Sequence, residues 1–155
     1  MSDLQKLELD RFLPYRLSIL SNLVSSAIAE RYSARFGISI PEWRVMAVLA
    51  MTPDLSAAQV AERTAMDKVA VSRAVASLLA KNHLERKMAP GDRRRSMLQL
   101  SPEGMRIYGE VAPLALSLEG SLIEVLEEGD RAALDRILTT LLGRARTLGE
   151  GLKTL

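Results

Sequence analysis

The sequence predicts a mainly α-helical fold with a small β-hairpin wing: a winged helix-turn-helix whose flanking N- and C-terminal helices form a dimerisation lobe. Two short helical patterns meet at a tight joint over residues 64–66, and an arginine-rich hairpin pattern follows over 84–100. Apolar residues recur at helical spacing on both sides of this segment. We therefore place the winged lobe at 38–100 and the dimerisation lobe at 1–37 and 101–155, within one domain of 155 residues.

A long amphipathic helix is predicted over residues 8–36, where apolar residues recur with a period close to 3.6. Pro14 marks either its true start or a kink, and Gly37 ends it. Helices over 42–51 and 57–63 each follow a capping box, a serine with Glu or Gln three residues later. The two boxes are Ser39 with Glu42 and Ser56 with Gln59.

A fourth helix is predicted over residues 68–81, with Asp67 as its N-cap. Ala65 occupies the turn before it, where glycine is commoner, so we expect the bend to be made without a left-handed residue. Small and branched apolar residues are expected to pack the third and fourth helices together. They are Val60, Ala61, Val71, Val75, Leu78 and Leu79.

The wing is predicted as two short strands, over residues 84–88 and 95–100, joined by a loop over 89–94. His83 precedes the first strand and is expected to be a partly buried residue in the bend after the fourth helix. As the single histidine of a chain without cysteine, it cannot build a histidine-rich metal site.

A fifth helix is expected to start at Ser101–Pro102, a cap followed by proline at the first helical position. Further along it, Gly109, Pro113 and Gly120 predict a bend. Gly129 is typical of a helix end and Asp130 of an N-cap, so this pair predicts a last helix over residues 131–148.

Positive charge is concentrated in the predicted winged segment. The chain has a net charge of only +2, but residues 63–95 hold nine Lys/Arg against three Asp/Glu, a net charge of +6. Neutralisation of phosphates supplies most of the affinity of DNA-binding proteins, so this distribution indicates double-stranded DNA as the partner. A solvated basic face without a partner is the alternative.

The fourth helix is predicted to enter the major groove of DNA. Arg73 suits a guanine edge or a phosphate, and Lys68 and Ser72 suit phosphate oxygens. Val69 and Ala70 are apolar and have only thymine methyl groups to read. Ser56 is a further candidate DNA contact. The alternative for Arg73 is a surface salt bridge.

Three consecutive arginines, Arg93, Arg94 and Arg95, mark the wing at residues 89–95 as a minor-groove contact. We expect Arg94 to insert into a narrow minor groove, where the negative potential is enhanced. Asp92 is expected to pair with one arginine and stiffen the loop. An exposed, solubilising loop is the alternative.

Apolar stripes on the terminal helices predict a homodimer, because the winged segment has too little surface to cover them. Packing within one chain is the alternative. The predicted interface residues are Leu4, Leu7, Phe12, Leu122, Leu134, Ile137, Leu138, Leu141, Leu142 and Leu148.

A weaker pattern indicates an effector site. Tyr15, Arg16, Trp43 and Met46 come from the two helices expected to flank the junction between the lobes. An arginine beside aromatic rings and methionine can hold the carboxylate of a small aromatic acid. The alternatives are core packing for Trp43 and Met46 and an interface salt bridge for Arg16.

An enzyme is disfavoured, since the sequence has no glycine-rich phosphate loop, no metal-ligand cluster and no nucleophile with an adjacent base. No cofactor is expected. No stretch approaches the roughly 20 apolar residues that span a bilayer, and no signal peptide is evident, so we expect a cytoplasmic, nucleoid-associated protein without membrane contact. A winged-helix module that binds proteins instead of DNA remains the alternative function.

The wing motif resembles that of the multiple-antibiotic-resistance regulator (MarR) family. The resemblance lies in Leu79, Leu84, Glu85 and Arg86, then Asp92–Arg93–Arg94, then residues 98–101 and Gly104, with a matching start of the second helix over 40–45. It implies a homodimeric transcriptional regulator, often a repressor, that binds a pseudo-palindromic operator and releases it when a small, often aromatic or phenolic, acid binds. Val69 and Ala70 depart from the hydroxylated residues common there, and the lack of cysteine sets the chain apart from peroxide-sensing members. The single histidine likewise argues against a zinc-responsive regulator.

Overall fold

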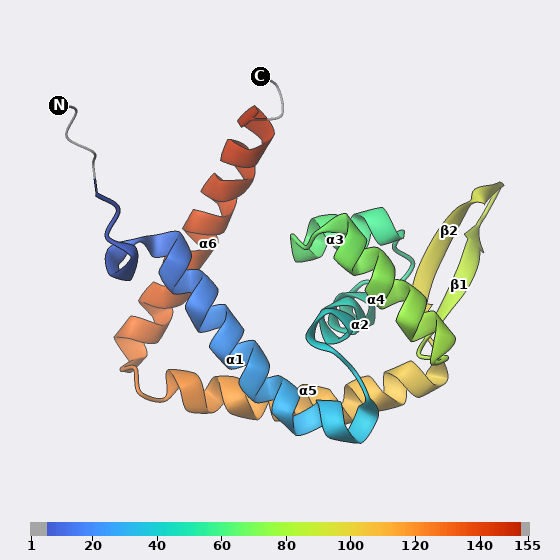
Figure 1. The fold of residues 1–155 in the computed structure, drawn as a ribbon, viewed down its shortest axis with the longest axis horizontal. Coiled ribbons are helices and arrows are strands. Elements are labelled where there is room, and N and C mark those ends of the chain that lie inside the picture. Colours follow the sequence, from blue (N-terminus) through green and yellow to red (C-terminus); the bar gives the residue numbers. More distant parts are fainter. Residues whose placement is uncertain (1–5, 153–155) are drawn as a thin grey trace. The chain divides into compact units, whose positions relative to one another are not determined.

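The computed structural model describes residues 6–152, apart from the side chains of Ala89, Leu152 and residues 93–95. The chain divides into two compact units, Met1–Leu116 and Ser117–Leu155, and each is described by itself. Figure 1 follows the order of the elements along the chain, which is η1 (Leu9–Arg11), α1 (Leu13–Phe36), α2 (Ile40–Met51), α3 (Ala57–Thr64), α4 (Lys68–Ala80), β1 (Leu84–Ala89), β2 (Asp92–Leu100), α5 (Pro102–Ile123) and α6 (Glu128–Leu152). The predicted class, mainly α with a hairpin wing, is confirmed.

Helix α1 begins at Leu13, after the separate 3-10 turn η1, and so does not run unbroken from residue 8 as predicted. Phe12 has an extended backbone (φ −76°, ψ 112°) and separates the two elements. Pro14 lies in the first turn, where the missing N–H costs no hydrogen bond, so it marks the start of the helix. Gly37 ends α1 as predicted, in the left-handed conformation at φ 63°.

Both predicted capping boxes are present. The Glu42 N–H donates to the Ser39 hydroxyl at 3.3 Å, and the Ser39 N–H donates to the Glu42 carboxylate at 2.8 Å. Ser56 and Gln59 repeat this exchange at the start of α3, at 3.2 and 2.9 Å. Helix α2 begins at Ile40, two residues earlier than predicted, because the glutamate of a capping box stands at the third helical position.

The joint between α3 and α4 contains a left-handed alanine. Ala65 has φ 51° and ψ 28°, so the prediction that the bend avoids a left-handed residue is wrong. A short reversal at the end of a helix requires this conformation, and here the chain makes it with alanine at a cost of about 1 kcal/mol. Asp67 caps α4 as predicted, since its carboxylate accepts from the N–H groups of Val69 (2.9 Å) and Ala70 (3.2 Å).

One core joins the helices of the first unit to the base of the hairpin. Of the residues predicted to pack α3 against α4, Val60, Ala61, Val71, Val75 and Leu78 are buried and Leu79 is half-buried. The remaining buried apolar residues come from the end of α1, from α2, from α4, from the hairpin, from α5 and from the connections on either side of α2. They are Tyr32, Ile38, Val45, Met46, Leu49, Leu55, Ala74, Leu84, Leu98, Leu100, Ile107 and Val111.

The hairpin is longer than predicted, and its loop is shorter. Strands β1 and β2 pair antiparallel up to Ala89 and Asp92, so only Pro90 and Gly91 form the turn. Proline followed by a glycine at φ 79° is the sequence that a type II turn requires, and these two residues suffice to reverse the chain. The loop predicted over residues 89–94 is therefore wrong.

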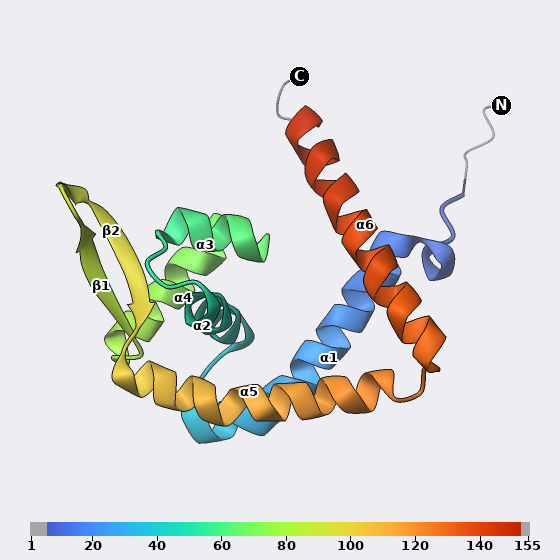
Figure 2. The same ribbon diagram turned by 180° about the vertical axis from the view of Figure 1, so that it is seen from behind.

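The three wing arginines lie in a bulge of strand β2. Met88 pairs with Ser96 and the next residue of β1, Ala89, pairs with Asp92, so residues 93–95 have no partner across the hairpin. A bulge of this kind bends the strand and redirects its side chains. Figure 2 shows the hairpin extending beside α4.

The base of the hairpin is tied to the connection between α2 and α3. Leu98 N–H donates to the Leu55 carbonyl at 2.8 Å, and Asp54 N–H donates to the Leu98 carbonyl at 3.0 Å. These bonds add a third strand-like segment to the base of the two-stranded sheet. The wing and the helix-turn-helix therefore share one backbone hydrogen-bond network.

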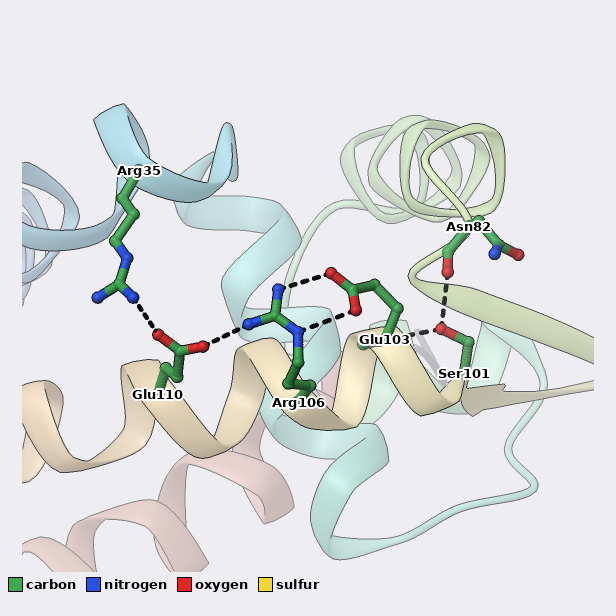
Figure 3. A network of polar contacts seen from close by, with 7 residues as sticks. Arg35, Asn82, Ser101, Glu103, Arg106 and Glu110 are labelled. Atoms are coloured by element: carbon green, nitrogen blue, oxygen red, sulfur yellow. Dashed lines mark hydrogen bonds and ion pairs between the residues drawn. The ribbon is translucent and has the colours of Figure 1, made fainter.

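A second network joins the end of α4 to the start of α5 (Figure 3). The Ser101 hydroxyl donates to the Asn82 carbonyl at 2.7 Å and accepts from the Gly104 N–H at 2.9 Å. Ser101 N–H donates to the His83 carbonyl at 3.1 Å. His83 is 8% exposed, which confirms a buried residue in this bend. Burial, followed by the neighbouring Lys81 charge, lowers the pKa of His83.

Helix α5 remains one helix from Pro102 to Ile123, through the glycine and proline positions expected to bend it. In the second unit, the Arg131 guanidinium donates to the carbonyls of Leu126 (3.0 Å) and Glu124 (3.3 Å). These carbonyls follow the last turn of α5, where helical partners are lacking. Arg131 thus closes the corner between α5 and α6.

Helix α6 begins at Glu128, three residues before the predicted start. Gly129 and Asp130 lie inside its first turn, so the stop-and-cap prediction is wrong. Glu128 and Asp130 place negative charge at the positive end of the helix dipole, which favours an early start. The helix extends to Leu152, four residues beyond the predicted end.

Gly104 generates a prediction about stability. A Cβ atom at this position would lie 2.0 Å from the His83 carbonyl oxygen, whereas one at Gly109, on the same helix, would meet nothing within 4 Å. We expect Gly104→Ala to lower the free energy of unfolding by about 2–3 kcal/mol, because backbone atoms must shift to admit the methyl group. Gly109→Ala is the control and should be neutral or raise it by up to about 1 kcal/mol. Urea denaturation followed by circular dichroism measures both, and equal effects would contradict the close approach.

Candidate nucleic-acid interface

Helix α4 has one buried face and one exposed face. Its buried residues are Val71, Ala74, Val75 and Leu78. On the opposite side, Val69, Ser72, Arg73 and Ala76 are all exposed and follow the i, i+3, i+4, i+7 spacing of a single helical stripe. We call these four residues the outer stripe. It contains small or medium side chains, one cation and no carboxylate, which suits close approach to the bases of a groove.

The structure brings most of the predicted major-groove contacts to this end of the first unit. Lys68, at the first position of α4, is exposed beside the outer stripe, and Ala70 is half-buried. Ser56 is half-buried at the start of α3, where its hydroxyl caps that helix. Arg73 forms no ion pair with the described residues, so the structure does not show the surface salt bridge that was the alternative to a DNA contact.

The predicted minor-groove contacts lie next to the turn of the hairpin. The backbone of residues 93–95 is in the β2 bulge, and their side chains fall outside the described part of the structure. Asp92, the predicted stiffening residue, pairs with Ala89 across the turn. Below the bulge, Arg86 donates to the Ser96 hydroxyl at 3.0 Å, and Gln99 donates to the Glu85 carboxylate at 3.1 Å. These cross-strand pairs stabilise the hairpin below the bulge.

An ion pair that the sequence analysis did not find anchors α4. The Glu42 carboxylate is 6% exposed, and the Lys81 ammonium donates to both of its oxygens at 2.9 and 3.0 Å. The same ammonium donates to the Gly37 carbonyl at 2.7 Å. The pair therefore joins the end of α1, the start of α2 and the end of α4. The 39-residue separation of Glu42 and Lys81 left no local signal in the sequence.

The surroundings of Glu42 favour the charged form of its carboxylate. Burial alone would raise the pKa of Glu42, but hydrogen bonds from Ser77 and from the Ser39 N–H, together with Lys81, outweigh it. The pKa of Glu42 consequently lies below its ordinary value. Ser77 lies on α4 and Lys81 directly follows its last residue, so this carboxylate is held by the C-terminal end of the candidate reading helix.

The four predicted effector residues lie in two separate places in the first unit. Trp43 stacks on Tyr108 of α5 with ring centroids 5.6 Å apart and contacts Tyr32 at 5.8 Å, while Met46 is fully buried. Tyr15 and Arg16 are exposed near the start of α1, and the 17 residues from Tyr15 to Tyr32 span roughly 25 Å of helix. Trp43 and Met46 thus pack in the core, whereas Tyr15 and Arg16 line a hollow with Asp10, Ile19, Leu20 and Leu23.

The predicted dimer residues are exposed in the single chain. None of the described residues of α6 is buried. Leu4 lies outside the described residues. The others and their exposed fractions are Leu7 61%, Phe12 41%, Leu122 42%, Leu134 39%, Ile137 47%, Leu138 37%, Leu141 39%, Leu142 56% and Leu148 52%.

Within the part of the chain that the structure describes, no three His, Cys, Asp or Glu side chains are grouped so that they could hold a metal ion. No described helix combines the length and apolar character needed to cross a membrane.

Comparisons with known proteins agree with this geometry. The model of the MarR family matches residues 36–95, the segment that holds the helix-turn-helix and most of the wing. The chain is similar to a MarR/EmrR family transcriptional regulator from Acinetobacter sp. ADP1, at 28% identity and a TM-score of 0.82, over 91% of this chain and 99% of that one. A comparison with curated proteins gives no match.

Two solved structures with lower identity share the fold. PcaV from Streptomyces coelicolor, solved in complex with its natural ligand, is 21% identical with a TM-score of 0.72, over 92% of this chain and 99% of that one. BpsR from Bordetella bronchiseptica, whose DNA binding is regulated by 6-hydroxynicotinic acid, is 20% identical with a TM-score of 0.76, over 88% and 96%. The resemblance indicated by the wing motif is confirmed.

The Glu42–Lys81 pair generates a prediction about pH. Since folding lowers the pKa of Glu42, its charge contributes stability that is present above about pH 4.5, the ordinary pKa of a glutamate, and is lost as the pH falls through the folded pKa. Lys81→Met should lower the free energy of unfolding by about 2 kcal/mol at pH 7, because it leaves a buried carboxylate without its cation. This deficit should shrink below pH 4.5, where the carboxylate takes up a proton.

Urea denaturation between pH 3 and pH 7 measures this effect. Glu62→Gln, which removes an exposed carboxylate from α3, is the matched control and should leave the pH dependence unchanged. A Lys81→Met deficit that stays constant over this range would show that the ion pair is not its cause.

Proposed function

We propose that this chain, a protein with the MarR family fold whose residues 36–95 match that family's model, is a homodimeric transcriptional repressor that a small molecule releases from DNA. In this proposal α4 enters the major groove of each half of a pseudo-palindromic operator, and the wing contacts the adjacent minor groove. The protein acts in the cytoplasm on the nucleoid. It is not an enzyme, in keeping with the regulators whose fold it shares.

The observation that carries the proposal is the outer stripe of α4. The stripe projects from a helix whose other face is anchored in the core, and it carries no carboxylate that would repel phosphates. Lys68 stands beside it, and the arginine bulge of the wing follows the same helix in the chain. Together with the net charge of +6 over residues 63–95, this favours DNA over a protein partner.

A homodimer is supported by the exposed apolar residues of the terminal helices. An α6 helix without a buried residue is not stable in water as a lone amphipathic helix, so a partner surface must cover it. A second copy supplies the same stripe, and a twofold axis would set two α4 helices about 34 Å apart, one turn of DNA.

An effector response is supported by the hollow at Tyr15 and Arg16. Its apolar residues, Ile19, Leu20 and Leu23, suit a ring, and the Arg16 guanidinium suits a carboxylate. The half-buried Trp43 and the buried Met46 pack with the core and do not line this hollow. PcaV binds a natural ligand, and the regulation of BpsR by 6-hydroxynicotinic acid favours a small aromatic acid as the class of effector.

Salt dependence tests DNA binding. In fluorescence-anisotropy titrations with duplex DNA from the promoter of its own gene, we expect log affinity to fall steeply and linearly with log salt concentration. Arg94→Ala should reduce that slope by about 1 and leave the far-ultraviolet circular dichroism unchanged. A flat salt response for the unmodified protein would favour the alternative function, a winged-helix module that binds proteins.

Sedimentation tests the dimer. We expect the unmodified chain to sediment as a dimer at micromolar concentration, and Leu141→Arg to shift it to monomer, because the substitution places a charge in the apolar interface. Met51→Arg is the control: Met51 is 83% exposed on α2, outside the predicted interface, and its variant should remain a dimer. A monomeric unmodified protein would contradict the proposal.

A thermal-shift screen tests the effector site. Small aromatic acids should raise the melting temperature of the unmodified protein, since a ligand that binds only the folded state stabilises it. Arg16→Ala should lose most of this shift if Arg16 holds the carboxylate. A shift that Arg16→Ala retains would place the ligand elsewhere.

A further inference from the structure

Val69 is the unusual member of the outer stripe. The other valines of α4, Val71 and Val75, are 1% and 3% exposed, whereas Val69 is 56% exposed. It lies in the first turn of the helix, and neither the core nor the capping of α4 uses its side chain. Exposed apolar surface is unfavourable in water, so burying the Val69 side chain against a partner would lower the free energy.

The backbone around Val69 offers no competing contact to a phosphate. Free N–H groups at a helix N-terminus bind phosphate, but here the Asp67 carboxylate accepts from the N–H groups of Val69 and Ala70 at 2.9 and 3.2 Å. The same carboxylate keeps a phosphate away from these two N–H groups. Any contact that Val69 makes with DNA is therefore made by its two methyl groups.

Only one base presents an apolar group in the major groove that a methyl group of Val69 could contact. Guanine, adenine and cytosine present acceptors and donors there, which would lose water opposite Val69 and gain no hydrogen bond. Thymine presents a C5-methyl group, the one apolar feature of the groove. Arg73 stands one helical turn further along the same stripe, and its guanidinium matches the O6 and N7 acceptors of guanine.

We propose that Val69 is a specificity-determining residue, which selects a thymine in each operator half-site through contact with its C5-methyl group, next to a guanine read by Arg73. This rests on the proposed function. It goes beyond that function by naming the base, the atom and the residue that select the operator.

The experiment begins with a duplex that the unmodified protein enriches from a random pool. Each thymine of the enriched half-sites is then replaced by deoxyuridine, which removes only the methyl group. We expect one position per half-site at which the replacement weakens binding about fourfold, the effect of burying one methyl group. Val69→Ala should bind thymine and deoxyuridine duplexes equally at that position, and Val69→Thr, which keeps one methyl group, should retain part of the preference.

Lys68→Ala is the matched control, because Lys68 is exposed beside Val69 but suits a phosphate. It should weaken binding to every duplex and leave the deoxyuridine effect intact. If deoxyuridine replacements have no effect on the unmodified protein, or if their effect is undiminished in Val69→Ala, the assignment of Val69 is wrong. The proposed function is not affected by either result. If the unmodified protein enriches no sequence from the pool, both the assignment of Val69 and the proposed function are wrong.

Discussion

Glu42 places a charged carboxylate at the meeting point of α1, α2 and α4, where water cannot stabilise it. Its charge is tolerated because each oxygen accepts from Lys81, and because the Ser39 N–H and Ser77 add further hydrogen bonds. Of these partners, Ser77 lies on α4 and Lys81 directly follows its last residue. Electrostatic pairing as well as apolar packing therefore holds α4 and its outer stripe against α2.

The wing is held to the same frame by backbone contacts. Leu98 exchanges hydrogen bonds with the Asp54–Leu55 segment, and Ser101 joins the Asn82–His83 bend to the first turn of α5. On α5, Arg106 pairs with Glu103 and Glu110, and Glu110 also pairs with Arg35 of α1 (Figure 3). These exposed pairs contribute little stability each, but they connect α1 to the helix that carries the wing. Within the first unit, α4 and the wing, the elements of the candidate interface, are each attached at more than one point.

Local signals in the sequence predicted most of the helices and both capping boxes, because a cap and its partner lie three residues apart. The errors have local physical causes. Residues 92–94 were predicted as part of a loop over 89–94, although Pro90 and Gly91 alone complete the turn. Gly129 and Asp130 resemble a stop and a cap, but the acidic first turn of α6 includes them.

Non-local features could not be predicted in the same way. The Glu42–Lys81 pair joins residues far apart in the sequence, and nothing near either one signals the other. The separation of Trp43 and Met46 from Tyr15 and Arg16 depends on where α2 packs along α1, which a one-dimensional pattern does not encode. The apolar stripe of α6 was predicted from spacing, and its interpretation as a dimer interface stays a prediction.

Ala65 has a consequence for how the helix-turn-helix meets a rigid partner. Glycine at this joint would relieve strain, but it would also let the backbone sample a wider range of angles between α3 and α4. Alanine, once held left-handed by the surrounding packing, has few other conformations within reach. The left-handed alanine therefore lowers the stability of the fold but fixes the angle between α3 and α4 in advance. Less orientational entropy would then be lost when both helices dock on a partner.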